Sequence, residues 1–188
     1  MIELGLVVGG YLIGSMSFAV LVSRLFGLPD PRSYGSGNPG ATNVLRTGKR
    51  AAAALTLLGD GGKGWLSVWI AQIFQIRYEL DPGVAAIVGL AAFAGHLWPV
   101  FFRFQGGKGV ATAAGVLAGF EPLLGFATML CWIGVAKVWR YSSLAALVGA
   151  LFAPIFYALM NNWLWQTRLD VLVCSVIMTC LLIYRHKE

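Results

Sequence analysis

Long apolar runs separated by short polar turns dominate the chain. The first run, from Leu4 to Ser23, holds 20 residues without a charge, which is about the length that a helix needs to cross a bilayer. The fourth run is shorter, and we expect it to form a partial or tightly packed span. The pattern predicts about seven transmembrane helices, over residues 3–24, 51–76, 82–102, 109–120, 122–139, 142–160 and 168–185.

Composition narrows the class of protein. Hydrophobic residues make up 58% of the 188 residues and charged residues only 12%, with a mean hydropathy of +0.74. A soluble domain does not hide that much apolar surface, and continuous rather than alternating runs argue against a β-barrel. The first run lacks the basic residues that open a signal peptide, so we expect it to be retained. No linker divides the chain, which predicts one all-α membrane-embedded domain over residues 1–188.

The basic residues predict the orientation in the membrane. Twelve lysine and arginine residues fall toward one side of the spans and two toward the other. Without Lys63, which lies inside the second span, the numbers are 11 and 2. By the positive-inside rule, the loops 25–50, 103–108 and 137–141 and the C-terminus lie in the cytoplasm. An odd number of spans then puts the N-terminus in the periplasm. Because the charges flank spans, nucleic-acid binding is a poor interpretation. The larger set is Arg24, Arg32, Arg46, Lys49, Arg50, Lys63, Arg103, Lys108, Lys137, Arg140, Arg185 and Lys187, and the smaller is Arg77 and Arg168.

A polar segment follows the first span, with the sequence GSGNPGATNVLRTGKR over residues 35–50. We expect a short helix here, with Asn38 as its N-cap and Pro39 in its first position. Glycines and hydrogen-bonding side chains are dense in this segment, which favours ligand binding over an ordinary surface loop. The candidate binding side chains are Ser36, Asn38, Thr42, Asn43 and Arg46.

The stretch FRFQGGKGVATAAG, over residues 102–115, has the character of an anion site. Glycines let backbone N–H groups approach an anion, and the N-terminus of the following helix attracts negative charge. The alternative is a tight re-entrant turn whose lysine follows the charge bias. A Walker A loop is excluded, because Gly109 follows Lys108 and no strand precedes the segment. The candidate phosphate-binding residues are Gly106, Gly107, Lys108, Gly109 and Thr112.

A third polar segment, WRYSSLAALVG, begins at Trp139. Ser142 either caps the next helix or, together with Ser143, contacts a ligand. The second, fourth and sixth spans all start at the predicted cytoplasmic face, where the basic residues also gather. The positive ends of their dipoles therefore meet at this face and suit the binding of anions.

Ionisable residues also occur inside the predicted spans. Asp60 and Lys63 are three residues apart on one helix, so we expect a structural ion pair that orients the loops, and Lys63 can also face the site. His96 is more typical of helix packing than of catalysis. With two histidines, and three cysteines inside apolar runs, the sequence indicates no metal or redox site.

Three blocks closely resemble the bacterial PlsY family, the acyl-phosphate:glycerol-3-phosphate acyltransferases. They are GSGNPGATNVLR from residue 35, GHLWPVFFRFQGGKGVAT from residue 95 and YRH from residue 184. The resemblance implies a seven-helix enzyme of the bacterial inner membrane with its active site at the cytoplasmic face. It implies acyl transfer from acyl phosphate to the 1-hydroxyl of glycerol 3-phosphate, giving lysophosphatidic acid and phosphate. It also implies that Ser36 and Arg46 are essential, that residues 106–109 form a phosphate loop, and that His186 is functional.

The sequence departs from the family pattern at three points. Gln105 stands where the family often has Lys, which removes one charge from the loop. The stretch GDGGKG at residues 59–64 has small residues where the family has bulky ones, so we expect looser packing there. The third block of the family continues with an Asn after the histidine, and no Asn follows His186 before Glu188.

Direct attack on an acyl phosphate needs no acyl-enzyme, and the sequence has no G-x-S-x-G nucleophile elbow. The general base stays open between His186 and the phosphate of the acceptor. A transporter for a phosphorylated solute is the alternative function, because the short, glycine-led fourth helix resembles the broken helices of transporters. For the enzyme we expect no cofactor, contact with membrane lipid and a monomer.

Overall fold

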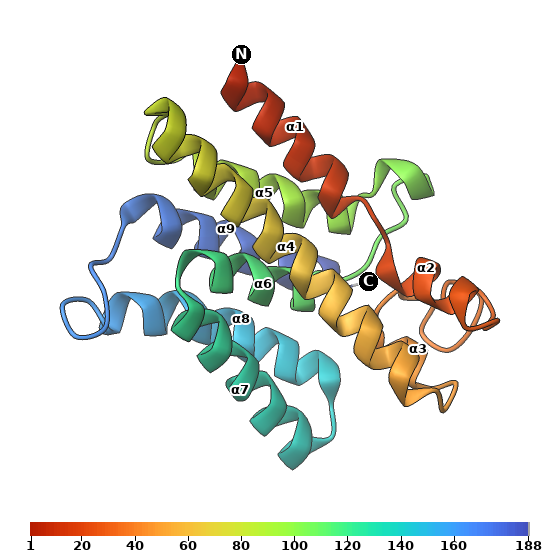
Figure 1. Cartoon of the computed structure of the whole chain (residues 1–188). Helices are drawn as coiled ribbons and strands as arrows, with labels where there is room; N and C mark the ends of the chain where they lie inside the picture. The colour runs from red at the N-terminus through yellow and green to blue at the C-terminus, as the bar shows by residue number, and fades with distance from the viewer. Residues whose placement is uncertain (188) are drawn as a thin grey trace.

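The computed structural model describes residues 1–187, whose regular structure is helical apart from an isolated bridge between Asn161 and Trp165. Figure 1 shows the long helix α4 running through the middle of the molecule, with α1 and α5 beside it and α7 and α8 at the opposite side. The helices are α1 (Ile2–Gly14), α2 (Phe18–Leu25), α3 (Ala41–Leu45), α4 (Arg50–Tyr78), α5 (Val84–Leu97), the 3₁₀ helix η1 (Val100–Phe102), α6 (Val110–Phe120), α7 (Pro122–Trp139), α8 (Ser142–Leu159) and α9 (Leu169–Arg185).

Each of the seven predicted apolar segments is helical, but the first is not one helix as predicted. It divides into α1 and α2, which are bent by 44° at a short break. Ser15 turns its hydroxyl back to the Tyr11 carbonyl oxygen at 2.8 Å, and Ser17 is extended. A serine hydroxyl that bonds the carbonyl four residues back favours a bend in a helix, and the extended Ser17 interrupts the helix here.

The third predicted segment also ends differently from the prediction. Regular α-helix stops at Leu97, and the 3₁₀ helix η1 follows Pro99. Proline disfavours helical geometry in the residue before it, and Trp98 accordingly has a φ of −131° and a ψ of 72°. This early end frees the chain to turn into the glycine-rich segment.

Three helices are long and apolar enough to cross a membrane by length and composition: residues 84–102, α7 and α8. The bent pair α1–α2 makes a fourth if it counts as one span. Helix α6 has 11 residues, in line with the short fourth segment expected from the sequence. Seven crossings and the orientation of the termini stay predictions.

Glycines bring the central helices into close contact. A Cβ atom at Gly115 on α6 would overlap the backbone carbonyl of Gly61 on α4, and a Cβ at Gly64 would overlap the Thr112 carbonyl. Such contacts allow the backbones of two helices to approach closely. The expectation of looser packing around residues 59–64 is therefore wrong, because these small residues accommodate α6.

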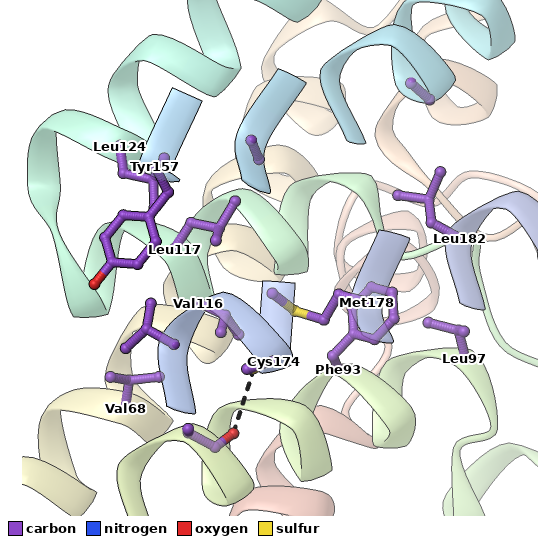
Figure 2. Packing of buried hydrophobic residues seen from close by; sticks show 14 residues of the cluster. Val68, Phe93, Leu97, Val116, Leu117, Leu124, Tyr157, Cys174, Met178 and Leu182 are labelled. Carbon is purple, nitrogen blue, oxygen red and sulfur yellow. Dashed lines mark hydrogen bonds between the residues drawn. The ribbon is translucent and has the colours of Figure 1, made fainter. Parts of the chain in front are cut away.

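The main hydrophobic core lies among α4, α5, α6, α7, α8 and α9. Figure 2 shows Met178 beside Phe93 and Leu97, and it shows Val116 and Leu117 near the centre of the cluster. The Cys174 thiol lies 3.5 Å from the carbonyl oxygen of Ala86. The described cysteines are free, as expected for residues used in packing. This core fixes the ends of α4, α5, α6 and α9 around the polar segments.

Candidate active site

A cavity of about 450 Å³ brings the three polar segments together. Its wall includes α3 and the loop before it, the first part of α4, the glycine segment before α6, the start of α8 and the residue that ends α9. Most candidates from the sequence contribute to this wall. They are Ser36, Asn38, Thr42, Asn43, Arg46, Asp60, His96, Lys108, Gly109, Ser142, Ser143 and His186.

Four other candidates lie outside the wall of the cavity. Gly106 and Gly107 are buried behind it, and Lys63 is buried on α4. Thr112 is fully buried on α6, and its hydroxyl oxygen has no hydrogen-bond partner among the described residues. This arrangement does not favour a direct ligand contact by any of these four residues.

Asn43 organises the loop before α3. Its side-chain nitrogen donates to the carbonyl oxygens of Pro31, at 2.7 Å, and Tyr34, at 3.1 Å. Its side-chain oxygen accepts from the N–H of Ser36 at 3.1 Å. Asn43 is 2% exposed, so its polar atoms serve the loop and hold Ser36 at the cavity.

The expected helix caps are wrong in two places. Helix α3 begins at Ala41 with Gly40 as its N-cap, not at Pro39 with Asn38, because the Gly40 N–H closes a tight turn onto the Asn38 carbonyl oxygen at 2.9 Å. Helix α8 begins at Ser142 itself and has Tyr141 as its N-cap, without a side-chain cap. The hydroxyl group of Ser142 is therefore not used as a cap.

The segment of residues 106–109, the glycine loop, is attached to the protein on two sides. The Gly107 N–H donates to the carbonyl oxygen of His96 at 3.1 Å. Arg185, in the last turn of α9, donates from Nη2 to the carbonyl oxygen of Gly106 at 3.3 Å. The Gly107 N–H is thus not free for the predicted contact with phosphate. Lys108 and Gly109 are the members of the loop that line the cavity.

Basic side chains dominate the wall of the cavity. Arg46, Arg50 and Lys108 line it, and Asp60 is the only acidic residue among its described lining residues. Asp60 pairs with Lys63, as predicted, with 3.0 Å between Oδ1 and Nζ. These three basic residues form no ion pair with residues 1–187, and such a site, with a neutralised carboxylate, suits anionic ligands.

His186 lies where α9 ends, and it is half-buried at the cavity wall. Burial lowers the pKa of this imidazole below its ordinary value, and the positive charge of Lys108 lowers it further, against the opposing effect of the Leu182 carbonyl. Nδ1 lies 2.8 Å from that carbonyl oxygen. Because a carbonyl only accepts, Nδ1 carries the proton of the neutral ring, and Nε2 is left as an acceptor.

A family model described as "Glycerol-3-phosphate acyltransferase" matches residues 4–188. The chain belongs to the glycerol-3-phosphate acyltransferase family. It is 59% identical over 179 residues to a glycerol-3-phosphate acyltransferase of Cupriavidus pinatubonensis, covering 95% of this chain and 86% of the relative. It is 58% identical over 182 residues to that of Bordetella pertussis, covering 97% and 84%. The resemblance noted from the three sequence blocks is confirmed.

Two solved structures of PlsY, an integral membrane glycerol 3-phosphate acyltransferase, have the same fold as this acyltransferase. The glycerol 3-phosphate form matches with a TM-score of 0.87 and 36% identity, and covers 100% of this chain and 90% of the other. The lysophosphatidic acid form matches with a TM-score of 0.87 and 35% identity, and covers 100% and 89%. An integral membrane enzyme is therefore confirmed, and the transporter alternative loses its support.

Two residues with a place in the site were not among the candidates. Arg50 lines the cavity, and Arg185 holds the glycine loop. In the sequence, both were explained by the positive-inside rule, which accounts for basic residues at span ends without giving them a partner. The YRH block did include Arg185, but nothing in it indicates contact with a residue 79 positions earlier.

Proposed function

We propose that the chain transfers a fatty acyl group from acyl phosphate to the 1-hydroxyl of sn-glycerol 3-phosphate, giving lysophosphatidic acid and inorganic phosphate. One observation carries the proposal: Arg46, Arg50 and Lys108 face a single cavity whose wall also holds His186, a histidine whose pKa is lowered by burial. Both substrates carry a phosphate, and three basic groups can balance the negative charge of the two phosphates. The two solved relatives, one in a glycerol 3-phosphate form and one in a lysophosphatidic acid form, support the acceptor and the product.

In the reaction, the 1-hydroxyl oxygen bonds to the acyl carbon, and the bond from that carbon to the phosphate oxygen breaks. The phosphate leaves with the bonding electrons, and its charge is stabilised by Lys108 and Arg46. Two groups can accept the proton of the hydroxyl: Nε2 of His186 and the phosphate of the acceptor. The remaining task of the protein is to position two phosphates in one cavity.

The apolar surroundings support a lipid donor. A second, narrow cavity among α6, α7, α8 and α9 has an apolar wall and shares Val110, Trp132 and Ala146 with the main cavity. The acyl chain would extend from the basic groups into this region, between helices and next to lipid. The loops are too short to form a docking domain for coenzyme A or a carrier protein, so binding energy from such carriers would not reach the reacting carbon.

The distribution of basic residues supports a cytoplasmic active site in the inner membrane. Arg46, Arg50 and Lys108 line the cavity, and Arg185 lies beside it. These residues belong to the set that the positive-inside rule assigns to the cytoplasm. The reaction therefore takes place at the membrane surface where soluble glycerol 3-phosphate is available.

A donor comparison tests the proposal. The purified protein is given glycerol 3-phosphate and the same acyl chain as phosphate, as coenzyme A thioester and as carrier-protein thioester. We expect the highest kcat/KM for lysophosphatidic acid formation with acyl phosphate, with one phosphate released per product. Equal or better use of the coenzyme A thioester would reject acyl phosphate as the donor and phosphate as the leaving group.

A further inference from the structure

Three ionisable side chains are buried together next to the glycine loop. Asp60 and Lys63 lie on α4 and His96 lies in the last turn of α5, each less than a tenth exposed. Lys63 Nζ lies 3.0 Å from Asp60 Oδ1, and His96 Nδ1 lies 3.6 Å from the same oxygen. We refer to these three residues as the Asp60 cluster. Its members come from two helices, so the contacts are not a consequence of sequence spacing alone.

The Asp60 cluster touches the glycine loop through His96. The carbonyl oxygen of His96 accepts from the Gly107 N–H, and a Cβ atom added at Gly107 would overlap Nε2 of the His96 ring. The ring therefore lies directly against the backbone of Gly107. Lys108, the next residue, lines the cavity. The orientation of the His96 ring thus limits where Lys108 can lie.

The cluster is also tied to the break between α1 and α2. Lys63 Nζ donates to the carbonyl oxygen of Met16 at 2.6 Å. Met16 lies in that break, where carbonyl oxygens lack their regular helical partners. Lys63 thereby connects the break to α4, and Asp60 extends the connection to α5 and the loop.

Asp60 is an unfavourable residue for an anion site unless its charge is balanced. It lines the same cavity as Lys108 and Arg46 and is 3% exposed. A buried, unpaired carboxylate repels a nearby phosphate more strongly than an exposed one, because water screens it less. Lys63 is paired with this carboxylate but does not itself line the cavity.

We propose that Asp60 and His96 are positioning residues for the glycine loop, and that Lys63 supplies the charge that makes Asp60 compatible with bound phosphate. Asp60 orients the ring of His96, the ring and carbonyl of His96 hold Gly107, and Gly107 sets the direction of Lys108. The inference rests on the proposed function, because it takes Lys108 to contact a substrate phosphate.

The charge balance is tested by comparing Lys63→Met with Asp60→Asn/Lys63→Met. The single variant leaves the carboxylate uncompensated, and we expect the KM for glycerol 3-phosphate or acyl phosphate to rise at least about tenfold. The double variant has lost both charges, and we expect that KM to return to within about threefold of the wild-type value. Equal KM values in the two variants would overturn the charge role of Lys63.

The positioning role is tested with the net charge held constant. Asn in Asp60→Asn/Lys63→Met keeps a polar oxygen beside His96 Nδ1, whereas Leu in Asp60→Leu/Lys63→Met does not. We expect the Leu variant to have a KM about tenfold above that of the Asn variant, with kcat within about threefold. A purely structural defect would lower the amount of active enzyme, and thus kcat, at an unchanged KM. That result would overturn the positioning role even if Lys63→Met does not fold.

Two controls separate this inference from packing and from the proposed function. Ser67 is buried one turn after Lys63 on α4 and donates to the Lys63 carbonyl at 2.8 Å, but it does not line the cavity. We expect Ser67→Ala to leave both KM values unchanged. Lys108→Met tests the loop itself. Unchanged KM values in Lys108→Met would reject phosphate binding by the loop. A raised KM in Lys108→Met, together with wild-type KM values in the Asp60 and Lys63 variants, would reject the positioning role alone.

Discussion

Arg185 at the end of α9 donates a hydrogen bond from Nη2 to the carbonyl oxygen of Gly106 at 3.3 Å. The two residues are separated by 79 positions in the sequence. The contact joins the last helix to the glycine loop, and His186, which follows Arg185, lines the same cavity. One short stretch of α9 therefore holds the loop and presents the imidazole.

Replacing Arg185 with Met should loosen the glycine loop. A hydrogen bond from a charged donor contributes about 1.5–3 kcal/mol, and its loss should raise the KM for the substrate phosphate by roughly tenfold. Steady-state kinetics with both substrates measures the effect. Lys187→Met removes the same charge from an exposed position two residues away and should leave KM unchanged. An equal rise in both variants would mean that overall charge, not the bond to Gly106, is responsible.

Replacing Asn43 with Asp should destabilise the loop before α3. Asp keeps an acceptor for the Ser36 N–H but places a second oxygen against the carbonyl oxygens of Pro31 and Tyr34. Burial of a group without its donors costs on the order of 2–4 kcal/mol. We expect a lower Tm in detergent.

The matched control for Asn43→Asp is Asn38→Asp in the same loop. The side chain of Asn38 makes no hydrogen bond with the described residues and is only partly buried. The same chemical change at this position should leave Tm nearly unaffected. Similar Tm losses in the two variants would mean that added negative charge, not loss of the Asn43 donors, destabilises the loop.

The sequence predicts the helices well because apolar runs and polar turns set their bounds. The break at Ser15 escaped prediction because Gly14 and two serines within a long apolar run are also compatible with a straight span. The bond from the Ser15 hydroxyl to the Tyr11 carbonyl, which favours the bend, depends on side-chain geometry. The end of α5 before Pro99 had a sequence signal, which the continuous apolar run concealed.

Most residues that line the cavity were predictable from the sequence, but their contacts were not. Gly107 stood out as a residue of minimal size, and in the structure the His96 ring lies where a Cβ atom of this residue would be. Asn43 was recognised as polar, yet its polar atoms bind the loop. Arg185 was explained by charge bias. In each case the decisive partner lies on a different segment, which residue type and spacing do not reveal.

Replacing Arg46 with Lys should reduce activity although the charge is kept. A guanidinium can hold two phosphate oxygens at once, whereas an ammonium acts as a point charge. The loss of one charge-assisted bond predicts a kcat/KM lower by roughly tenfold or more. Arg103→Lys is the control, because Arg103 is exposed and does not line the cavity. Normal turnover in Arg46→Lys would mean that Arg46 serves mainly as a cytoplasmic anchor.

The lowered pKa of His186 predicts a particular dependence of stability on pH. Burial and the charge of Lys108 disfavour the imidazolium form in the folded protein, whereas in the unfolded chain the ring binds a proton near its ordinary pKa of about 6.5. Below that pH the unfolded state therefore binds more protons than the folded state. The contribution of His186 to stability is therefore fully present above about pH 6.5. It is lost as the pH decreases from about 6.5 toward the lowered pKa of the folded protein.

His186→Gln isolates this contribution. The chain has two histidines, and the variant retains His96, so any effect of His96 cancels in the difference between the two proteins. We expect the Tm of the wild-type protein to drop more than the Tm of His186→Gln when the pH is lowered from 7.5 to 5.5, at constant ionic strength in detergent. The readout does not require activity, so a variant that is inactive still gives an answer, and titration of the substrate phosphate does not contribute. A parallel decline of the two Tm values would mean that the folded protein protonates His186 as readily as the unfolded chain does. The neutral ring beside Lys108 would then lose its support, and the acceptor phosphate would be left as the general base.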